Sequence, residues 1–135
     1  MSPTKNTLII GVVFLAVGSL FSESGLAECQ DNIAKISSIS MKVLKEIYQS
    51  LGADEVILDV RTREEYLAGH VPGAINIPHT EVENYVSELS KYKTIYVHCK
   101  SGKRAKIAIE ALAKRGLNNL VLVKDSGMAD WIGQH

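Results

Sequence analysis

The sequence predicts an α/β fold, a single domain in which an open, mostly parallel sheet carries helices on both faces. Two observations lead to this prediction. Short apolar runs alternate along the chain with segments of helical periodicity, and strands that are apolar throughout are typical of a parallel sheet covered on both faces. The chain has 135 residues, of which 46% are hydrophobic, so it is long enough for one domain with a single core.

The domain begins with a helix and a strand. Apolar side chains recur at helical spacing over residues 40–51, and Ser40 stands where a helix cap is expected. The apolar run 55–60 then predicts a short strand. Thr62 and Glu65 have the spacing of a capping box, in which each side chain binds a backbone N–H of the other, so a brief helix is expected directly after this strand.

The same alternation continues toward the centre of the chain. Residues 73–78, bounded by Pro72 and Pro78, predict a second strand. Thr80 and Glu83 repeat the spacing of a capping box, which predicts another helix. A third apolar run, 94–98, predicts the next strand.

A basic turn, "HCKSGKRA" at 98–105, separates that third strand from the following helix. The helix is expected to start near Lys103 and to end at Gly116, and a last strand is predicted over 119–123. In open α/β sheets, ligands bind beyond the carboxyl ends of the strands, where backbone N–H groups at helix starts point outward. The basic turn is therefore the expected place for chemistry.

Cys99 stands at the start of this turn. Gly102 allows the positive φ that a tight turn with inward N–H groups needs. Such N–H groups would stabilise a thiolate more than exposed lysines do, because solvent screens the lysine charges. We expect the backbone to activate Cys99, while Lys100, Lys103 and Arg104 attract an anionic substrate. His98 is expected to be packed or hydrogen-bonded to the backbone rather than catalytic.

The N-terminus resembles an export signal. Lys5 precedes an uncharged apolar run over 8–21, and Gly25 and Ala27 occupy the small-residue positions of a cleavage site after Ala27. This run would span about 21 Å as a helix, which is shorter than the roughly 30 Å of a bilayer's hydrocarbon core. The sequence therefore predicts an exported, periplasmic protein.

Two alternatives to cleavage after Ala27 stay open. One is a retained membrane anchor, and the other is a lipoprotein at Cys29, although Glu28 stands where lipoprotein signals have a small residue. The predicted organisation is a signal peptide over 1–27, an extension over 28–35 and the folded domain over 36–135. The only two cysteines are seventy positions apart, so they predict neither a disulfide framework nor a metal site. The role of Cys29 stays undetermined.

Three stretches resemble the single-domain rhodaneses, which are thiosulfate sulfurtransferases, and in particular the small exported ones. "LDVRTREEYLAGHVPGAINIP" at 58–78 resembles the family's opening signature, and "CKSGKR" at 99–104 resembles its six-residue active-site loop. "DSGMADW" at 125–131 is similar to its closing Gly-Gly-x-x-x-Trp element, with Ser126 in place of the first glycine. The resemblance covers about residues 36–132 and implies a rhodanese-like sheet.

The resemblance also implies roles for individual residues. Cys99 would be the nucleophile that accepts a sulfane sulfur from thiosulfate or a related donor and passes it to a thiol or cyanide. Asp59 and Arg61 would form a structural ion pair, and His70 would be a framework histidine. No cofactor and no metal is implied. The remaining loop residues would supply the N–H groups and the cationic wall: Lys100, Ser101, Gly102, Lys103 and Arg104.

Two other functions are compatible with the sequence. A cysteine phosphatase has five residues between its cysteine and arginine, whereas Cys99 and Arg104 have four between them, so this reading is less favoured even though Asp125 could act as a general acid. A non-enzymatic module that carries persulfide or binds a partner is the second alternative. The formal net charge of zero gives no signal for nucleic acid. The expected partners are a small anionic sulfur donor and its acceptor, the protein is expected to be a monomer, and membrane contact is expected only if the signal is retained.

Overall fold

The computed structural model describes residues 36–125 and 127–132. The predicted signal peptide, the N-terminal extension, Cys29 and Ser126 lie outside the described residues. No helix within the described part is both long enough and apolar enough to cross a membrane.

Five parallel strands form one sheet, in the order β1-β5-β4-β2-β3. Parallel neighbours require crossover connections, and here each crossover contains a helix or a helical turn, as the alternation in the sequence predicts. The strands are β1 (Ser37–Ser40), β2 (Glu55–Asp59), β3 (Ile75–Asn76), β4 (Thr94–His98) and β5 (Leu120–Lys124).

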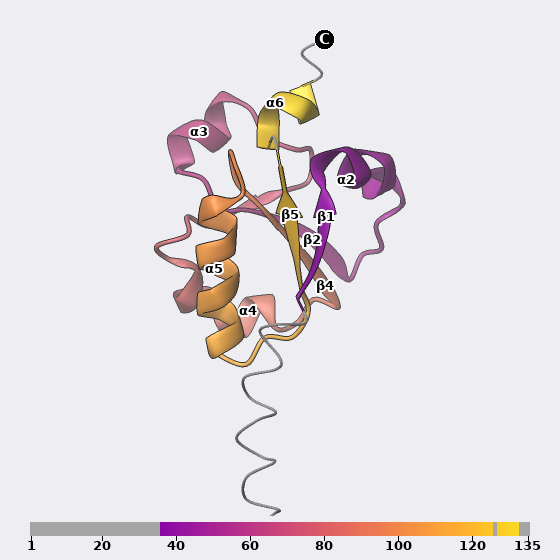
Figure 1. Ribbon diagram of the computed structural model, residues 1–135. Helices are drawn as coiled ribbons and strands as arrows, with labels where there is room; N and C mark the ends of the chain where they lie inside the picture. The colour runs from indigo at the N-terminus through magenta and orange to yellow at the C-terminus, as the bar shows by residue number, and fades with distance from the viewer. Residues whose placement is uncertain (1–35, 126, 133–135) are drawn as a thin grey trace, which may run out of the picture. The chain divides into compact units, whose positions relative to one another are not determined.

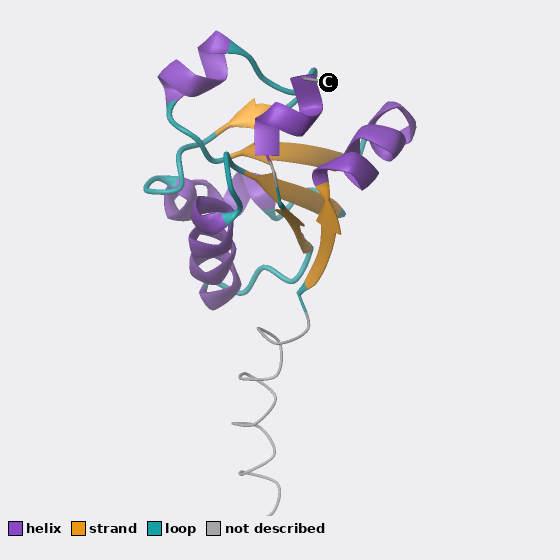
Figure 2. Ribbon diagram, turned by 45° about the horizontal axis from the view of Figure 1, so that its top comes forward, coloured by secondary structure: helices purple, strands orange, loops and turns teal. Residues whose placement is uncertain are grey.

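Helices lie on both sides of this sheet (Figures 1 and 2). On one side, α5 runs along β4 and β5, with α4 behind it, and on the other side lies α2. The short helices α3 and α6 lie at the carboxyl end of the sheet, beside the start of α5 (Figure 1). The helical segments are α2 (Met41–Ile47), which continues as η1 (Tyr48–Ser50), α3 (Arg63–Ala68), η2 (Val82–Tyr85), α4 (Val86–Leu89), α5 (Lys103–Lys114) and α6 (Gly127–Ile132).

The core consists of two apolar clusters, one on each face of the sheet. Successive side chains of a strand point to opposite faces. Along β2, Leu58 packs under α5 in the first cluster, with Leu112, whereas Ile57 packs in the second, with Leu44 of α2. All four side chains are buried. Val97 of β4 and Ala105 in the first turn of α5 are also buried in the first cluster, which fixes β4 and the start of α5 in place. The buried core therefore holds the turn that follows β4.

The capping signals of the sequence led to one correct and one wrong prediction. Thr62 and Glu65 form both hydrogen bonds of a capping box at the start of α3. Thr80 does not cap the next helical segment, because η2 starts one residue later, after Glu81, and has no side-chain cap. A 3₁₀ turn closes i to i+3 backbone bonds, and the Asn84 N–H donates to the Glu81 carbonyl, so no reciprocal box is formed here.

The strand predictions were less complete. The strand expected over 73–78 contains only Ile75–Asn76 in its ladder with β2. The edge strand β1, Ser37–Ser40, was not predicted, because serine-rich residues give no apolar strand signal. Ser40 is both the last residue of β1 and the cap of α2, where its Oγ accepts from the Val43 N–H at 3.2 Å.

Candidate active site

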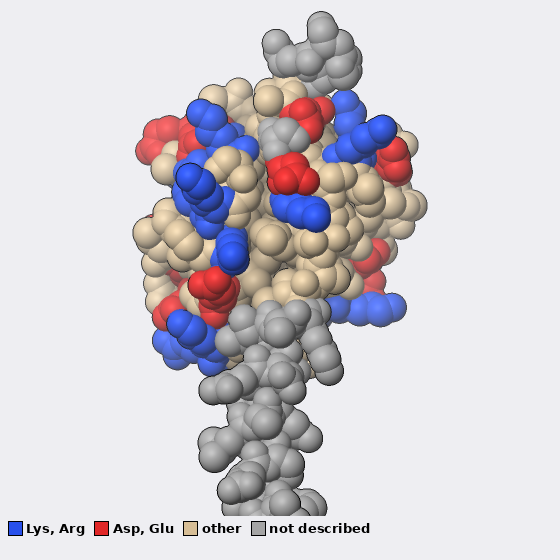
Figure 3. Space-filling view, in the orientation of Figure 1, with Lys and Arg blue, Asp and Glu red and all other residues tan. Residues whose placement is uncertain are grey.

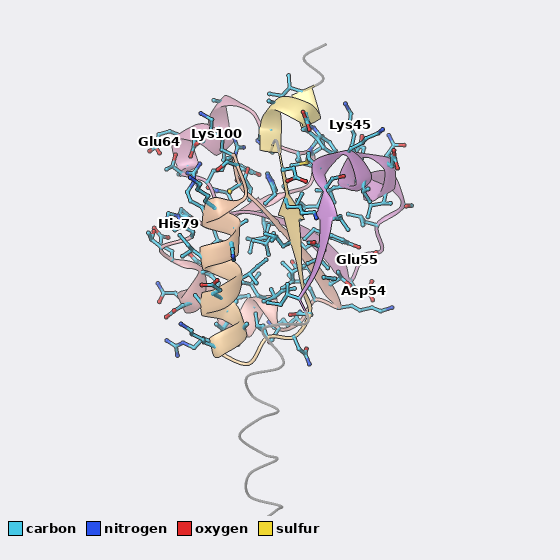
Figure 4. The ribbon with its side chains drawn as sticks, in the orientation of Figure 1. Lys45, Asp54, Glu55, Glu64, His79 and Lys100 are labelled. Carbon is cyan, nitrogen blue, oxygen red and sulfur yellow. The ribbon has the colours of Figure 1, made fainter. Side chains whose placement is uncertain are left out.

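The six-residue loop 99–104 lies where β4 ends and α5 begins, at the carboxyl end of the sheet. Cys99 is 1% exposed, so its sulfur lies at the base of the loop rather than on the surface. Lys100 is exposed and lies near α3, as does Glu64 (Figure 4). Asp54 and Glu55, at the start of β2, lie at the opposite end of the sheet in the same figure.

The Cys99 sulfur is bound by the backbone of its own loop. The Gly102 N–H donates to Cys99 Sγ at 3.0 Å. Gly102 has φ +92° and is the N-cap of α5 without any side-chain cap. A side chain there would meet only ordinary contacts, with Lys124 Cα at 3.8 Å, so the positive φ and not the space requires glycine. One backbone N–H of the loop is therefore directed at the Cys99 sulfur.

The start of α6 closes one wall of the loop. Gly127 is buried, and a Cβ placed on it would overlap the backbone carbonyls of Lys100 and Cys99. Asp125, which precedes it by two residues, has φ +66°, an uncommon conformation for a residue other than glycine. The Gly127 N–H donates back to the Asp125 carbonyl at 2.5 Å. This tight turn brings the backbone of α6 directly against the backbone of the loop.

Two of the three loop cations are exposed and one is bound. Lys100 and Lys103 are exposed, and Lys and Arg side chains are visible over α3 and the first turns of α5 (Figure 3). Arg104 instead points its guanidinium at Glu65 of α3, with Nη1–Oε2 at 2.6 Å and Nη2–Oε1 at 3.0 Å. Ser101 is exposed and has no side-chain hydrogen bond to a described residue.

This ion pair changes the titration of both partners. The hydrogen bonds from Arg104 are the main cause that lowers the pKa of Glu65 to about 2. Burial opposes them, and the backbone N–H of Thr62 adds a smaller lowering effect. The hydrogen bond with Glu65 also raises the pKa of Arg104. The guanidinium is thus directed to a carboxylate of the protein and is not aimed at the Cys99 sulfur as a free cation.

Asp59 and Arg61 form a buried ion pair behind the loop. Arg61 Nη2 donates to Asp59 Oδ2 at 2.7 Å, and Arg61 Nε contacts both carboxylate oxygens at 3.0 and 3.1 Å. The same Nη2 donates to the Gly69 carbonyl at 2.7 Å, which holds the end of α3. Asn76 Nδ2 donates to the Asp59 and Arg61 carbonyls at 3.0 Å and attaches β3 to this frame.

The two histidines of interest lie in different environments. His98 is completely buried, and its Nε2 is 3.7 Å from Asp59 Oδ2, beyond hydrogen-bond range. Burial lowers the pKa of His98, although the nearby Asp59 opposes this effect. His70 is exposed, stacks on the Tyr66 ring at 3.8 Å and places Nδ1 2.9 Å from the Tyr66 carbonyl oxygen. Among the described residues, neither histidine ring donates a hydrogen bond to the Cys99 sulfur.

Three contacts of the site were not predicted from the sequence. Glu65 was assigned only to a helix cap, and Gly127 and Asn76 belonged only to stretches that resemble family signatures. Each is separated in the sequence from the group that it contacts, and the signature stretches that contain Asn76 and Gly127 were the only signals for these two residues. Among the described residues, no group of three or more His, Cys, Asp or Glu side chains is arranged to hold a metal ion.

Several known proteins are similar to this chain in sequence and in fold. The rhodanese-like domain family matches residues 42–134. The "Putative sulfur carrier protein YrkF" of Bacillus subtilis (strain 168) is 37% identical over 116 residues, which cover 84% of this chain and 60% of that protein. The thiosulfate:glutathione sulfurtransferase of Saccharomyces cerevisiae is 27% identical, with 81% of this chain and 87% of that protein covered.

A solved structure gives the same result for the fold. The rhodanese-related protein of Thermoplasma volcanium superposes with a TM-score of 0.60 and 33% identity over 71% of this chain and 90% of that one. This chain spans only 60% of the Bacillus relative and 38% of a Mycobacterium tuberculosis HTH-type transcriptional regulator that it also matches. The family match, the parallel sheet and the cysteine loop agree, and the chain belongs to the rhodanese-like domain family, with sulfurtransferases among its relatives.

Proposed function

We propose that this chain is a thiosulfate sulfurtransferase that works through a persulfide on Cys99. The single observation that carries the proposal is the hydrogen bond of 3.0 Å from the Gly102 N–H to Cys99 Sγ, in a loop that starts a helix without a side-chain cap. Such a loop stabilises negative charge on one sulfur atom and, once Cys99 is loaded, on the sulfur that it carries.

The reaction has two displacement steps. In the first, the Cys99 thiolate attacks the outer sulfur of thiosulfate, a new S–S bond forms, and sulfite leaves with the electron pair of the bond that breaks. In the second, a thiolate or cyanide attacks the outer sulfur of the persulfide, and the electron pair of that S–S bond returns to Cys99. The products are a new persulfide or thiocyanate, and the enzyme is regenerated without a cofactor.

Surface charge supports an anionic donor. Lys100 and Lys103 are exposed at the loop, and neither forms an ion pair within residues 36–125 and 127–132. Thiosulfate is a dianion, so two unpaired ammonium groups raise its local concentration near Cys99. Arg104 contributes less to this attraction than the sequence suggested, because Glu65 neutralises its charge.

A persulfide carrier is the second candidate, and the name of the Bacillus relative favours it. A carrier uses the same first step but passes its sulfur only to a specific partner protein. The two functions therefore differ in whether a small acceptor, such as cyanide or glutathione, removes the sulfur from Cys99 and allows repeated catalytic cycles. The phosphatase reading is disfavoured by the ion pair of Arg104, since that side chain is engaged by Glu65 and not directed toward a phosphate.

Steady-state assays of the purified chain test the proposal. We expect thiosulfate with cyanide to yield thiocyanate, and thiosulfate with glutathione to yield sulfite, at rates that Cys99→Ser reduces to background. A Lys93→Gln variant removes an exposed positive charge before β4 and serves as the control for protein preparation and for the loss of one charge. Its rates are expected to equal those of the wild type. Full activity of Cys99→Ser would contradict the mechanism. Persulfide formation without turnover by either acceptor would indicate the carrier instead.

A further inference from the structure

The ion pair between Arg104 and Glu65 connects the active-site loop to a different element of the fold. Arg104 is the second residue of α5, and its backbone belongs to the same loop as Cys99 and Gly102. Its guanidinium binds both carboxylate oxygens of Glu65, at 2.6 and 3.0 Å. A planar guanidinium fixes a carboxylate in both distance and orientation, which a single ammonium contact does not do.

Glu65 is itself held in place by α3. Its Oε2 accepts from the Thr62 N–H at 3.0 Å, and its own N–H donates to Thr62 Oγ1 at 3.3 Å. One carboxylate oxygen thus serves both the helix cap and the guanidinium. Because the capping box fixes the rotamer of Glu65, Arg104 is bound to a preorganised acceptor.

The far end of α3 is attached to the buried part of the site. Arg61, which is paired with the buried Asp59, donates to the Gly69 carbonyl directly after α3. The helix that presents Glu65 is therefore fixed at its start by Thr62 and at its end by Arg61. A rigid frame of this kind can define the position of the loop backbone relative to β4.

We propose that Glu65 is a positioning residue, which acts through Arg104 to hold the Gly102 N–H on the sulfur of Cys99. The inference deepens the proposed sulfurtransferase function and rests on it for its catalytic consequence. Lys100 and Lys103 then attract the anion, whereas the ion pair of Arg104 and Glu65 fixes the position of the loop backbone. Glu65 touches neither donor nor acceptor in this role.

The chain offers a selective variant and a matched control. Glu65→Gln keeps the capping box, because glutamine also serves at this position, but it loses the charged two-oxygen acceptor for Arg104. Glu64→Gln makes the same change of charge on the preceding residue of α3, which is exposed and makes no ion pair with a described residue (Figure 4). The difference between the two variants isolates the contact with Arg104.

Two measurements on the full chain read out the position of the loop. The first is the ¹⁵N-resolved amide signal of Gly102 and its hydrogen exchange, which report the bond to Sγ without any need for activity. The second is the kinetics of thiosulfate use. For Glu65→Gln we expect a displaced, faster-exchanging Gly102 amide and a kcat reduced roughly tenfold or more, since small misplacements of a reacting group have effects of this size. The KM for thiosulfate should change no more than in Glu64→Gln.

A double variant tests whether Glu65 acts through its partner. Arg104→Gln should move the Gly102 amide in the same way, and Glu65→Gln combined with Arg104→Gln should add little to either single change. An unchanged Gly102 amide in Glu65→Gln would overturn the inference, and so would a lower KM at constant kcat, which would make Glu65 a charge modulator only. If the wild type does not use thiosulfate, the proposed function fails, while the amide signal still decides the positioning role.

Discussion

His98 directly precedes Cys99 in the sequence and is packed in the core of the domain. Its ring is completely buried, and neither ring nitrogen has a hydrogen-bond partner among the described residues. Burial lowers the pKa of His98 below its ordinary value of 6.5. The unfolded chain therefore binds a proton at this residue more readily than the folded protein does, so folding stability must decrease as the pH falls below 6.5.

The prediction for His98 concerns stability rather than activity. His98→Leu replaces the ring with an apolar side chain of similar size and removes two unsatisfied buried nitrogens. We expect the wild type to lose more stability than His98→Leu between about pH 7.5 and about pH 5, because only the wild type must exclude a proton from this ring on folding. Urea unfolding at both pH values measures this. An equal loss in both proteins would show that His98 does not contribute to the acid sensitivity.

The site residues differ in how far the sequence alone could identify them. Cys99 and Gly102 lie three positions apart in one turn, so the local pattern was sufficient to predict a backbone N–H directed at the sulfur. The contact of Arg104 with Glu65 joins residues 39 positions apart. Local patterns do not encode such a contact, because it depends on where α3 and α5 meet in the folded protein. The same reason explains why the close approach of Gly127 to the loop backbone was not predicted.

At the scale of elements, the strands and helices with strong periodicity were predicted close to their observed bounds, the short strand β3 was predicted too long, and the polar strand β1 was not predicted. The strands β2, β4 and β5 and the helices α2 and α5 follow apolar patterns that their burial explains. β1 contains three serines and pairs only with β5 at the edge of the sheet, so it needs few apolar residues. Its existence depends on the tertiary pairing with β5 and not on its own sequence.

The two capping signals lead to a direct test. Thr62 accepts from the Glu65 N–H, whereas Thr80 accepts no capping hydrogen bond. Loss of a threonine cap costs about 1 kcal/mol, so Thr62→Ala should lower the free energy of unfolding by about that amount. Thr80→Ala, the matched change in the false box, should have almost no effect. Chemical denaturation of both variants provides the comparison, and equal destabilisation would contradict the assignment of the caps.

At the scale of the whole molecule, the formal net charge of zero conceals a local excess of positive charge. Lys100 and Lys103 are exposed at the carboxyl end of the sheet, beside the loop. Lys91 and Lys93 are equally exposed but precede β4, at the opposite end. Because exposed charges are screened beyond about 10 Å in 0.1 M salt, only the first pair should influence a donor at Cys99.

This arrangement predicts different effects for two double variants with the same loss of charge. Lys100→Gln with Lys103→Gln should raise the KM for thiosulfate roughly threefold to tenfold at low salt, and the difference from the wild type should shrink as salt is added. Lys91→Gln with Lys93→Gln should leave the KM almost unchanged. Initial-rate kinetics at two salt concentrations measure this, and equal effects of both double variants would rule out a local role of the loop lysines.

The persulfide on Cys99 is the central claim, and the intact mass of the full chain tests it most directly. After brief treatment of the reduced protein with thiosulfate, we predict a gain of one sulfur atom, about 32 Da, that cyanide removes and that is absent from Cys99→Ser. No gain in wild-type protein whose Cys99 is shown to be reduced, or the same gain in Cys99→Ser, would contradict the account.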